Sequence, residues 1–195
     1  MNVSRRFILK GIALGGLAGM TLGRWGLSLA NNAASAQAQS TRPLLVLVSG
    51  EAEQSAFLRG IAAALPDKRP WVQRTDLGMG FVQDFTRLLR SGRPIRIIGL
   101  VDDASAALII ELARASDARL PWLGYHSASP GQSRHRLLGD QASSELAARL
   151  DSRQWTAILG LALASRGSAP TGLAPPADAA QSPLPGHFVS FAIET

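Results

Sequence analysis

The chain has 195 residues and no cysteine, which excludes disulfide bonds, thiolate nucleophiles, Cys-ligated zinc, iron–sulfur clusters and c-type haem attachment. Its stability must therefore come from the hydrophobic core. The formal net charge of +6 and the sequence pI of about 11.1 suggest nucleic-acid binding only if the positive charges belong to the folded domain.

The first residues carry an export motif. Ser4-Arg5-Arg6-Phe7-Ile8-Leu9-Lys10 precedes an apolar, glycine-rich run at 11–23. This stretch resembles a twin-arginine signal, whose pattern is Ser/Thr-Arg-Arg-x-Phe-Leu-Lys, and it departs from that pattern only at Ile8. The residues that match are Ser4, Arg5, Arg6, Leu9 and Lys10. The resemblance implies export by the twin-arginine translocase, after folding in the cytoplasm, to the periplasm.

The apolar run is short for a membrane anchor. A spanning helix needs roughly 20 apolar residues, and small residues follow that favour cleavage after Ala36 or Ala38. An uncleaved anchor, prolonged by residues 25–29, is the alternative. We predict a signal peptide at 1–38, with only transient membrane contact.

Removal of the signal peptide lowers the net charge from +6 to +2, because residues 1–36 hold four basic and no acidic residues. Nucleic-acid binding is then not expected.

The rest of the chain alternates between short apolar runs and helical periodicity. Strands are predicted at 43–49, 71–77, 95–101, 120–124, 136–138, 156–164 and 188–193, and helices at 51–65, 78–91, 104–118 and 143–150. The segment at 95–124 is typical of a strand–helix–strand crossover unit. The alternation predicts an α/β fold, a single three-layer αβα sandwich with a mostly parallel sheet of Rossmann or flavodoxin type.

We predict an α/β domain at 39–166, a Pro/Ala/Gly-rich loop at 167–187, and a C-terminal strand of the same domain at 188–195. Val189, Phe191 and Ile193 alternate with Ser190 and Ala192, which indicates a half-buried strand at the edge of the sheet. The loop has no hydrophobic period. Its length indicates either disorder or a lid or partner-docking segment.

Polar residues follow the predicted strands where an open α/β sheet binds ligands. The candidate ligand-binding residues are Ser49, Gly50, Asp102, Asp103, His126 and Ser127. The alternative for Ser49-Gly50 is a strand-ending turn, and for the aspartates it is capping of the next helix. Ser49 lacks the glycine of a nucleophile elbow, and the dinucleotide and Walker phosphate spacings are missing. We therefore predict no catalytic residue.

Three histidines are present, His126, His135 and His187. None has the helical spacing of a zinc pair. A turn between 127 and 134 is one way to bring His126 and His135 together, but we predict no metal site.

Two segments resemble a lobe of a type I periplasmic substrate-binding protein. They are 42–65, a buried strand, Ser-Gly and a helix, and 98–107, Ile-Gly-Leu-Val-Asp-Asp-Ala-Ser-Ala-Ala. The resemblance implies a non-catalytic protein that binds a small molecule, although the chain has length for one lobe only. The alternatives are a small periplasmic hydrolase, a flavin-binding redox protein, or an escort subunit of an exported redox complex. The sequence identifies no ligand or cofactor.

Overall fold

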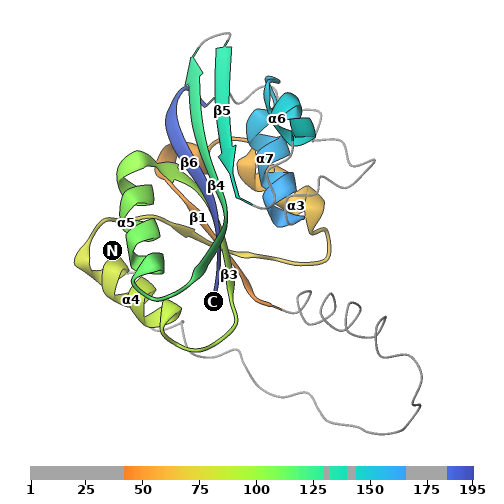
Figure 1. The fold of residues 1–195 in the computed structure, drawn as a ribbon. Coiled ribbons are helices and arrows are strands. Elements are labelled where there is room, and N and C mark those ends of the chain that lie inside the picture. Colours follow the sequence, from red (N-terminus) through yellow and green to blue (C-terminus); the bar gives the residue numbers. More distant parts are fainter. Residues whose placement is uncertain (1–41, 130–131, 140–143, 166–183) are drawn as a thin grey trace, which may run out of the picture. The chain divides into compact units, whose positions relative to one another are not determined.

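A six-stranded sheet in the order β2-β1-β3-β6-β4-β5 forms the centre of the computed structural model (Figure 1). The structure describes residues 42–129, 132–139, 144–165 and 184–195. The predicted signal peptide at 1–38 and most of the predicted loop at 167–187 lie outside these residues. The strands are β1 (Leu44–Val48), β2 (Trp71–Arg74), β3 (Arg96–Asp102), β4 (Arg119–Ser129), β5 (Gln132–Leu138) and β6 (Gly186–Glu194).

The α/β class is confirmed, but the sheet is mixed and not mostly parallel. β1 pairs in parallel with β2 and β3, whereas β6 pairs antiparallel with β3 and β4, and β4 antiparallel with β5. The C-terminal strand β6 is therefore central, and the prediction of an edge strand is wrong. Small side chains at Ser190 and Ala192 look like a solvent-facing stripe in the sequence, yet both are fully buried.

Helices cover both faces of the sheet (Figure 1). α4 (Met79–Leu89) and α5 (Asp103–Arg114) lie on one face, and α2 (Gly50–Glu53), α3 (Phe57–Ala64), α6 (Ser144–Leu150) and α7 (Trp155–Ala164) on the other. The continuous apolar runs of β1 and β3 suit burial on both faces. Val46, Val48, Ile98 and Leu100 pack toward α3 and α7, whereas Leu45, Leu47, Ile97 and Val101 pack toward α4 and α5.

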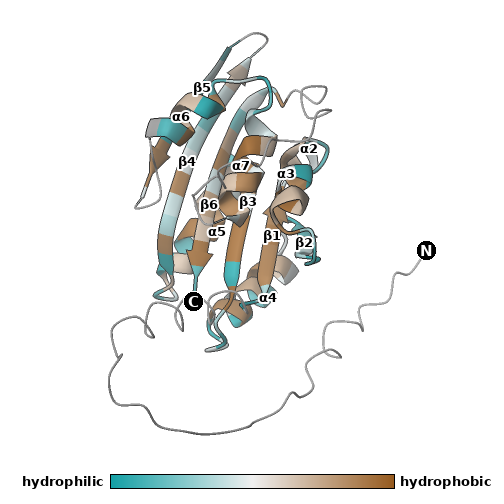
Figure 2. Ribbon diagram, turned by 90° about the vertical axis from the view of Figure 1, so that its right-hand side faces the viewer, coloured by the Kyte–Doolittle hydropathy of each residue, from teal (hydrophilic) through white to brown (hydrophobic). Residues whose placement is uncertain are grey.

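Residues 156–164 form helix α7, so the strand predicted there is wrong. All ten residues of α7 are buried, and Figure 2 shows the helix as apolar as the central strands. A short segment that is apolar on every side has no period that separates a buried helix from a buried strand. The buried guanidinium of Arg96 donates to the carbonyls of Leu163 (2.5 Å) and Ala164 (3.2 Å), which complements the negative end of this helix.

Among the described residues, no helix is long and apolar enough to cross a membrane.

Two glycines let α3 and α7 cross with their backbones in contact. A Cβ added at Gly60 would lie 2.0 Å from the carbonyl oxygen of Ala157, and one added at Gly160 would lie 2.2 Å from that of Phe57. Both obstacles are backbone atoms, which no rotamer change can move. The spacing between these helices is therefore fixed by glycine at both positions.

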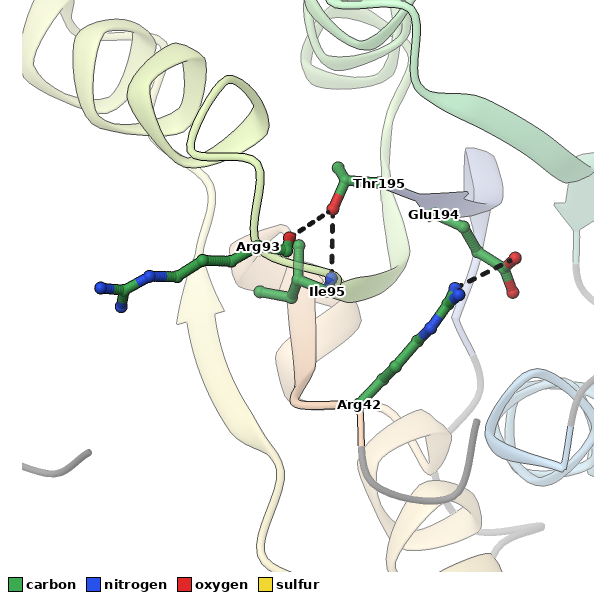
Figure 3. A network of polar contacts seen from close by, with 5 residues as sticks. All are labelled: Arg42, Arg93, Ile95, Glu194 and Thr195. Carbon is green, nitrogen blue, oxygen red and sulfur yellow. Dashed lines mark hydrogen bonds and ion pairs between the residues drawn. The ribbon is translucent and has the colours of Figure 1, made fainter. Parts of the chain in front are cut away.

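The end of the chain is tied to the start of β3 (Figure 3). The Thr195 hydroxyl donates to the Arg93 carbonyl at 2.8 Å and accepts from the Ile95 N–H at 3.1 Å. Glu194 lies 3.7 Å from the Arg42 guanidinium. These contacts hold the register of β6 against β3 at the end of these strands that is remote from the predicted site.

Candidate ligand-binding site

A pocket of about 310 Å³ opens at the edge of the sheet where β3 and β4 end and β6 begins. Both β3 and β4 run antiparallel to β6, so their carboxyl ends meet at this edge. We call it the basic pocket. The lining residues that share one face of the sheet or the start of α5 are Asp103, Tyr125, Ser127, Arg134, Arg136 and His187. His126, His135 and Phe188 also border it, but their side chains pack on the opposite face.

The strand register arranges these residues in rows. Ser127 of β4 pairs with Arg134 of β5 on one side and with His187 of β6 on the other. Tyr125 pairs in the same way with Arg136. Directly paired residues have Cβ atoms roughly 4.5 to 5.5 Å apart, so each row spans about 10 Å across three strands. The row that contains His187 ends beside the start of α5.

Asp103 is the acidic member of the basic pocket. It is the first residue of α5 and follows Asp102, which pairs with Phe188 next to His187. Among the described residues, the pocket thus combines two guanidinium groups, one imidazole, one phenol and one hydroxyl with a single carboxylate. Arg134 and Arg136 are exposed and make no ion pair or side-chain hydrogen bond with the described residues.

A buried polar chain lies directly behind the pocket. The indole N–H of Trp122 donates to Ser190 Oγ at 2.9 Å, and this oxygen lies 2.8 Å from Nε2 of His126. Nδ1 of His126 lies 2.8 Å from Nδ1 of His135, its direct partner across β4 and β5. Four side chains from three strands are therefore joined in one line through the sheet.

One assignment of protons satisfies this line. Because Ser190 Oγ accepts from Trp122, its hydroxyl is free to donate to Nε2 of His126. His126 then carries its proton on Nδ1 and donates to Nδ1 of His135. The proton of His135 sits on Nε2, which is buried and makes no hydrogen bond of good geometry with the described residues. The negative charge of Asp151 acts on the His135 ring.

Both imidazoles are held neutral. Burial lowers the pKa of His126 from 6.5 to about 3, and repulsion from His135 acts in the same direction. Burial also lowers the pKa of His135, against the opposite effects of Asp151 and the Leu150 backbone. A charged imidazole in this site would lose its hydration without gaining a carboxylate partner in contact.

Aromatic packing fixes the two histidines from the side of α7. The ring of Trp155 stacks on His126 with centroids 5.2 Å apart, and it also contacts His135 at 5.1 Å. Gly124 leaves the space, because a Cβ there would lie 2.5 Å from Ser190 Oγ and 2.9 Å from His126 Nε2. Tyr125 and Ser127 flank His126 in the chain, and Arg134 and Arg136 flank His135. The buried chain therefore positions the backbone that carries the pocket residues.

The structure divides the six residues predicted from the sequence. Asp103, His126 and Ser127 border the basic pocket, whereas Ser49, Gly50 and Asp102 do not. Asp102 is the N-cap of α5 and accepts from the N–H (2.9 Å) and hydroxyl (2.8 Å) of Ser105. Burial acts to raise the pKa of Asp102, but these hydrogen bonds outweigh it and hold the pKa below its usual value.

Ser49 and Gly50 form the turn after β1. Ser49 Oγ is buried and makes no hydrogen bond to the described part of the chain. The Arg74 guanidinium lies against Gly50, where an added Cβ would be 2.0 Å from Nη2. Because this is the far end of a flexible, exposed side chain, the contact does not by itself require glycine at this turn.

Sequence reasoning missed Tyr125, Arg134, Arg136 and His187 as residues of the pocket. Exposed and half-buried positions alternate along β5. The exposed positions are Gln132, Arg134, Arg136 and Leu138, and the half-buried positions between them are Ser133, His135 and Leu137. A strand whose outward residues are basic lacks the apolar signal used to find strands, but its period of two was present in the sequence.

No group of three or more His, Asp or Glu among the described residues is arranged to hold a metal ion. Comparison with family models, curated proteins and solved structures found no match for this chain.

Proposed function

We propose that this chain is an exported, periplasmic, non-catalytic binding protein, and that a small ligand binds in the basic pocket. The observation that carries the proposal is the convergence of hydrogen-bonding side chains from three strands on a pocket of about 310 Å³, which is at the lower end of the size of small-molecule sites. The resemblance of residues 42–65 and 98–107 to a lobe of a type I substrate-binding protein, with its three-layer sandwich, supports the same proposal.

The arrangement of the histidines favours binding over catalysis. His126 and His135 share a hydrogen bond of 2.8 Å, but their rings face away from the pocket and burial lowers the pKa of both. Proton transfer in the pocket would depend on His187, for which no hydrogen bond to Ser127 or Asp103 is present among the described residues. The pocket therefore offers contacts to a ligand without a preformed nucleophile and base.

A thermal-shift screen of small metabolites on the full-length chain tests the binding proposal. A ligand of the basic pocket should raise the melting temperature of the wild type and of Trp71→Ala, which alters an exposed residue on the opposite edge strand. It should not raise that of Tyr125→Ala, because the exposed phenol ring lies in the pocket. A shift that survives in Tyr125→Ala would place the ligand elsewhere, and a screen without any shift would count against a binding function.

A hydrolase is the second candidate, and one observation favours it. Ser127 and His187 are direct cross-strand partners, and Asp103 follows Asp102, the partner of the neighbouring Phe188. A nucleophile, a base and an orienting acid in adjacent positions are the components of a hydrolytic triad. Hydrolysis of p-nitrophenyl acetate or phosphate by the full-length protein, abolished in both Ser127→Ala and His187→Gln, would establish this candidate and overturn the non-catalytic proposal.

Export is tested separately from binding. Arg5→Lys combined with Arg6→Lys should leave the protein in the cytoplasm, whereas Lys10→Arg should be exported as the wild type. Periplasmic protein from the double variant would argue for another route. An absorbance spectrum of the protein purified from cytoplasm addresses the redox alternatives, because a flavin band would favour them.

A further inference from the structure

We infer that the ligand of the basic pocket is a small phosphate monoester whose phosphate group is held between Arg134 and Arg136. This inference rests on the proposed binding function and adds the chemical class of the ligand. It is carried by the placement of the two arginines, by the number of donors around them, and by the size of the pocket.

The two arginines lie close together and have no acidic partner among the described residues. They are two residues apart on the same face of β5, which places their Cα atoms roughly 6.5 to 7 Å apart. Arg87 and Arg114, on exposed helix surfaces, each pair with an acidic residue three positions earlier at 2.8 Å. Arg134 and Arg136 make no such pair with the described residues, and Asp103 is the one acid among the described residues that line their pocket. The site therefore favours an anion.

The donor set fits a tetrahedral oxyanion better than a carboxylate. One guanidinium group saturates a carboxylate through a two-pronged pair of hydrogen bonds. Here two guanidinium groups are joined by the Ser127 hydroxyl, which lies in the same row as Arg134, and by the His187 ring. Three phosphate oxygens can accept from all of these donors, whereas a single carboxylate would leave part of them without a partner.

The remaining surfaces of the pocket describe the rest of the ligand. Tyr125 is 45% exposed and offers a ring face and a phenol beside Arg136. Asp103 lies at the far end of the pocket and accepts hydrogen bonds from a hydroxyl or ammonium group. A second negative charge near Asp103 would be repelled. The pocket thus suits a compact phosphate monoester with a polar, non-anionic body.

Calorimetry on the full-length chain in 150 mM NaCl tests the inference with glycerol 3-phosphate as the probe. Glycerate is the matched control, since it has a similar polyol body but a planar carboxylate. We expect glycerol 3-phosphate to bind at least tenfold more tightly than glycerate. Arg134→Gln and Arg136→Gln should each weaken it at least tenfold, because each removes a charged pair of hydrogen bonds. Arg134→Lys should lose part of the affinity, and Arg114→Gln should change it less than twofold.

The outcomes separate this inference from the proposed function. Equal binding of glycerate and glycerol 3-phosphate, or binding unaffected by both glutamine variants, overturns the phosphate class. If glycerol 3-phosphate does not bind but the thermal-shift screen finds a ligand sensitive to Tyr125→Ala, the pocket binds another class of ligand and only this inference fails. If no compound binds in either assay, both fail. The melting temperature of each arginine variant in the absence of ligand shows whether it is folded.

Discussion

The buried imidazole of His126 makes the free energy of unfolding depend on pH in a way that can be calculated. The side chain is 2% exposed and its pKa in the folded protein is about 3, against 6.5 in a model peptide. Below pH 6.5 the unfolded chain binds a proton that the folded chain does not bind. Stability contributed by this group is therefore fully present above pH 6.5 and is lost as the pH falls from 6.5 toward 3.

The size of the loss follows from the two pKa values. Each pH unit within this window removes about 1.4 kcal/mol, so a change from pH 7.5 to pH 4.5 should lower the free energy of unfolding by about 2 to 3 kcal/mol. His135 contributes in the same direction, since burial lowers its pKa as well. Asp102, whose pKa is lowered, titrates below the range from pH 7.5 to pH 4.5.

Urea unfolding of the wild type, His126→Gln and His187→Gln at several pH values between 7.5 and 4.5 measures this effect. Glutamine keeps a hydrogen-bonding group next to Ser190 but does not titrate. Between pH 7.5 and pH 4.5, His126→Gln should therefore lose about 2 kcal/mol less unfolding free energy than the wild type. His187→Gln alters an exposed histidine and should follow the wild type.

An equal loss of stability in His126→Gln and the wild type would refute the reasoning. If His126→Gln does not fold, the NMR resonance of the His126 ring in the wild type gives the same information. It should stay unchanged from pH 7.5 to pH 4.5, and a titration with a midpoint near pH 6 would show that the ring is accessible to protons.

Three further predictions concern the core and the caps. Gly160→Ala should destabilise the protein by at least about 2 kcal/mol in thermal or urea unfolding, because the added Cβ meets the backbone of α3. The matched control Gly80→Ala, where the added Cβ has no atom within 4 Å, should be neutral or slightly stabilising, and equal effects of the two variants would contradict the close helix crossing. Leu100→Ala should cost roughly 2 to 5 kcal/mol of unfolding free energy through lost transfer energy and a cavity, and a loss below about 0.5 kcal/mol is incompatible with its complete burial in β3. Asp102→Ala should cost about 1 kcal/mol by removing the cap of α5 and leave ligand affinity unchanged, while weakened binding would show that Asp102 contributes to the site.

The parts of the fold that the sequence predicts are those in which local pattern and burial agree. β1 and β3 are continuous apolar runs because both of their faces are covered, and α4 has Phe81 and Phe85 four residues apart on its buried side. Residues 155–164 are apolar on every side, so their period carries no information. Leucine and alanine outnumber β-branched residues in this segment, and this excess was the remaining clue that it forms a helix.

The candidate site was predictable only where it depends on strand ends. Asp103 and Ser127 follow or end predicted strands, and the sheet brings them to one edge. Which face each side chain occupies depends on the pairing partner of its strand, and a single-residue shift exchanges the faces. The alignment of His126 with His135 arises from the register of the β4–β5 hairpin, and the contact of His126 with Ser190 arises from the insertion of β6. Neither pairing is recorded in local sequence.

The central position of β6 also determines how the sheet can close. β1, β2 and β3 pair with one another and β4 pairs with β5, whereas β6 is the partner of both β3 and β4. Until β6 inserts, the two groups of strands have no pairing between them, and one edge of β3 and one edge of β4 remain open. Pairings between strands that are far apart in the chain form slowly, because the entropy of loop closure is lost before the contacts are gained. A chain in which β6 is displaced therefore presents two unpaired strand edges from the centre of its sheet, and such edges are templates for pairing with another chain.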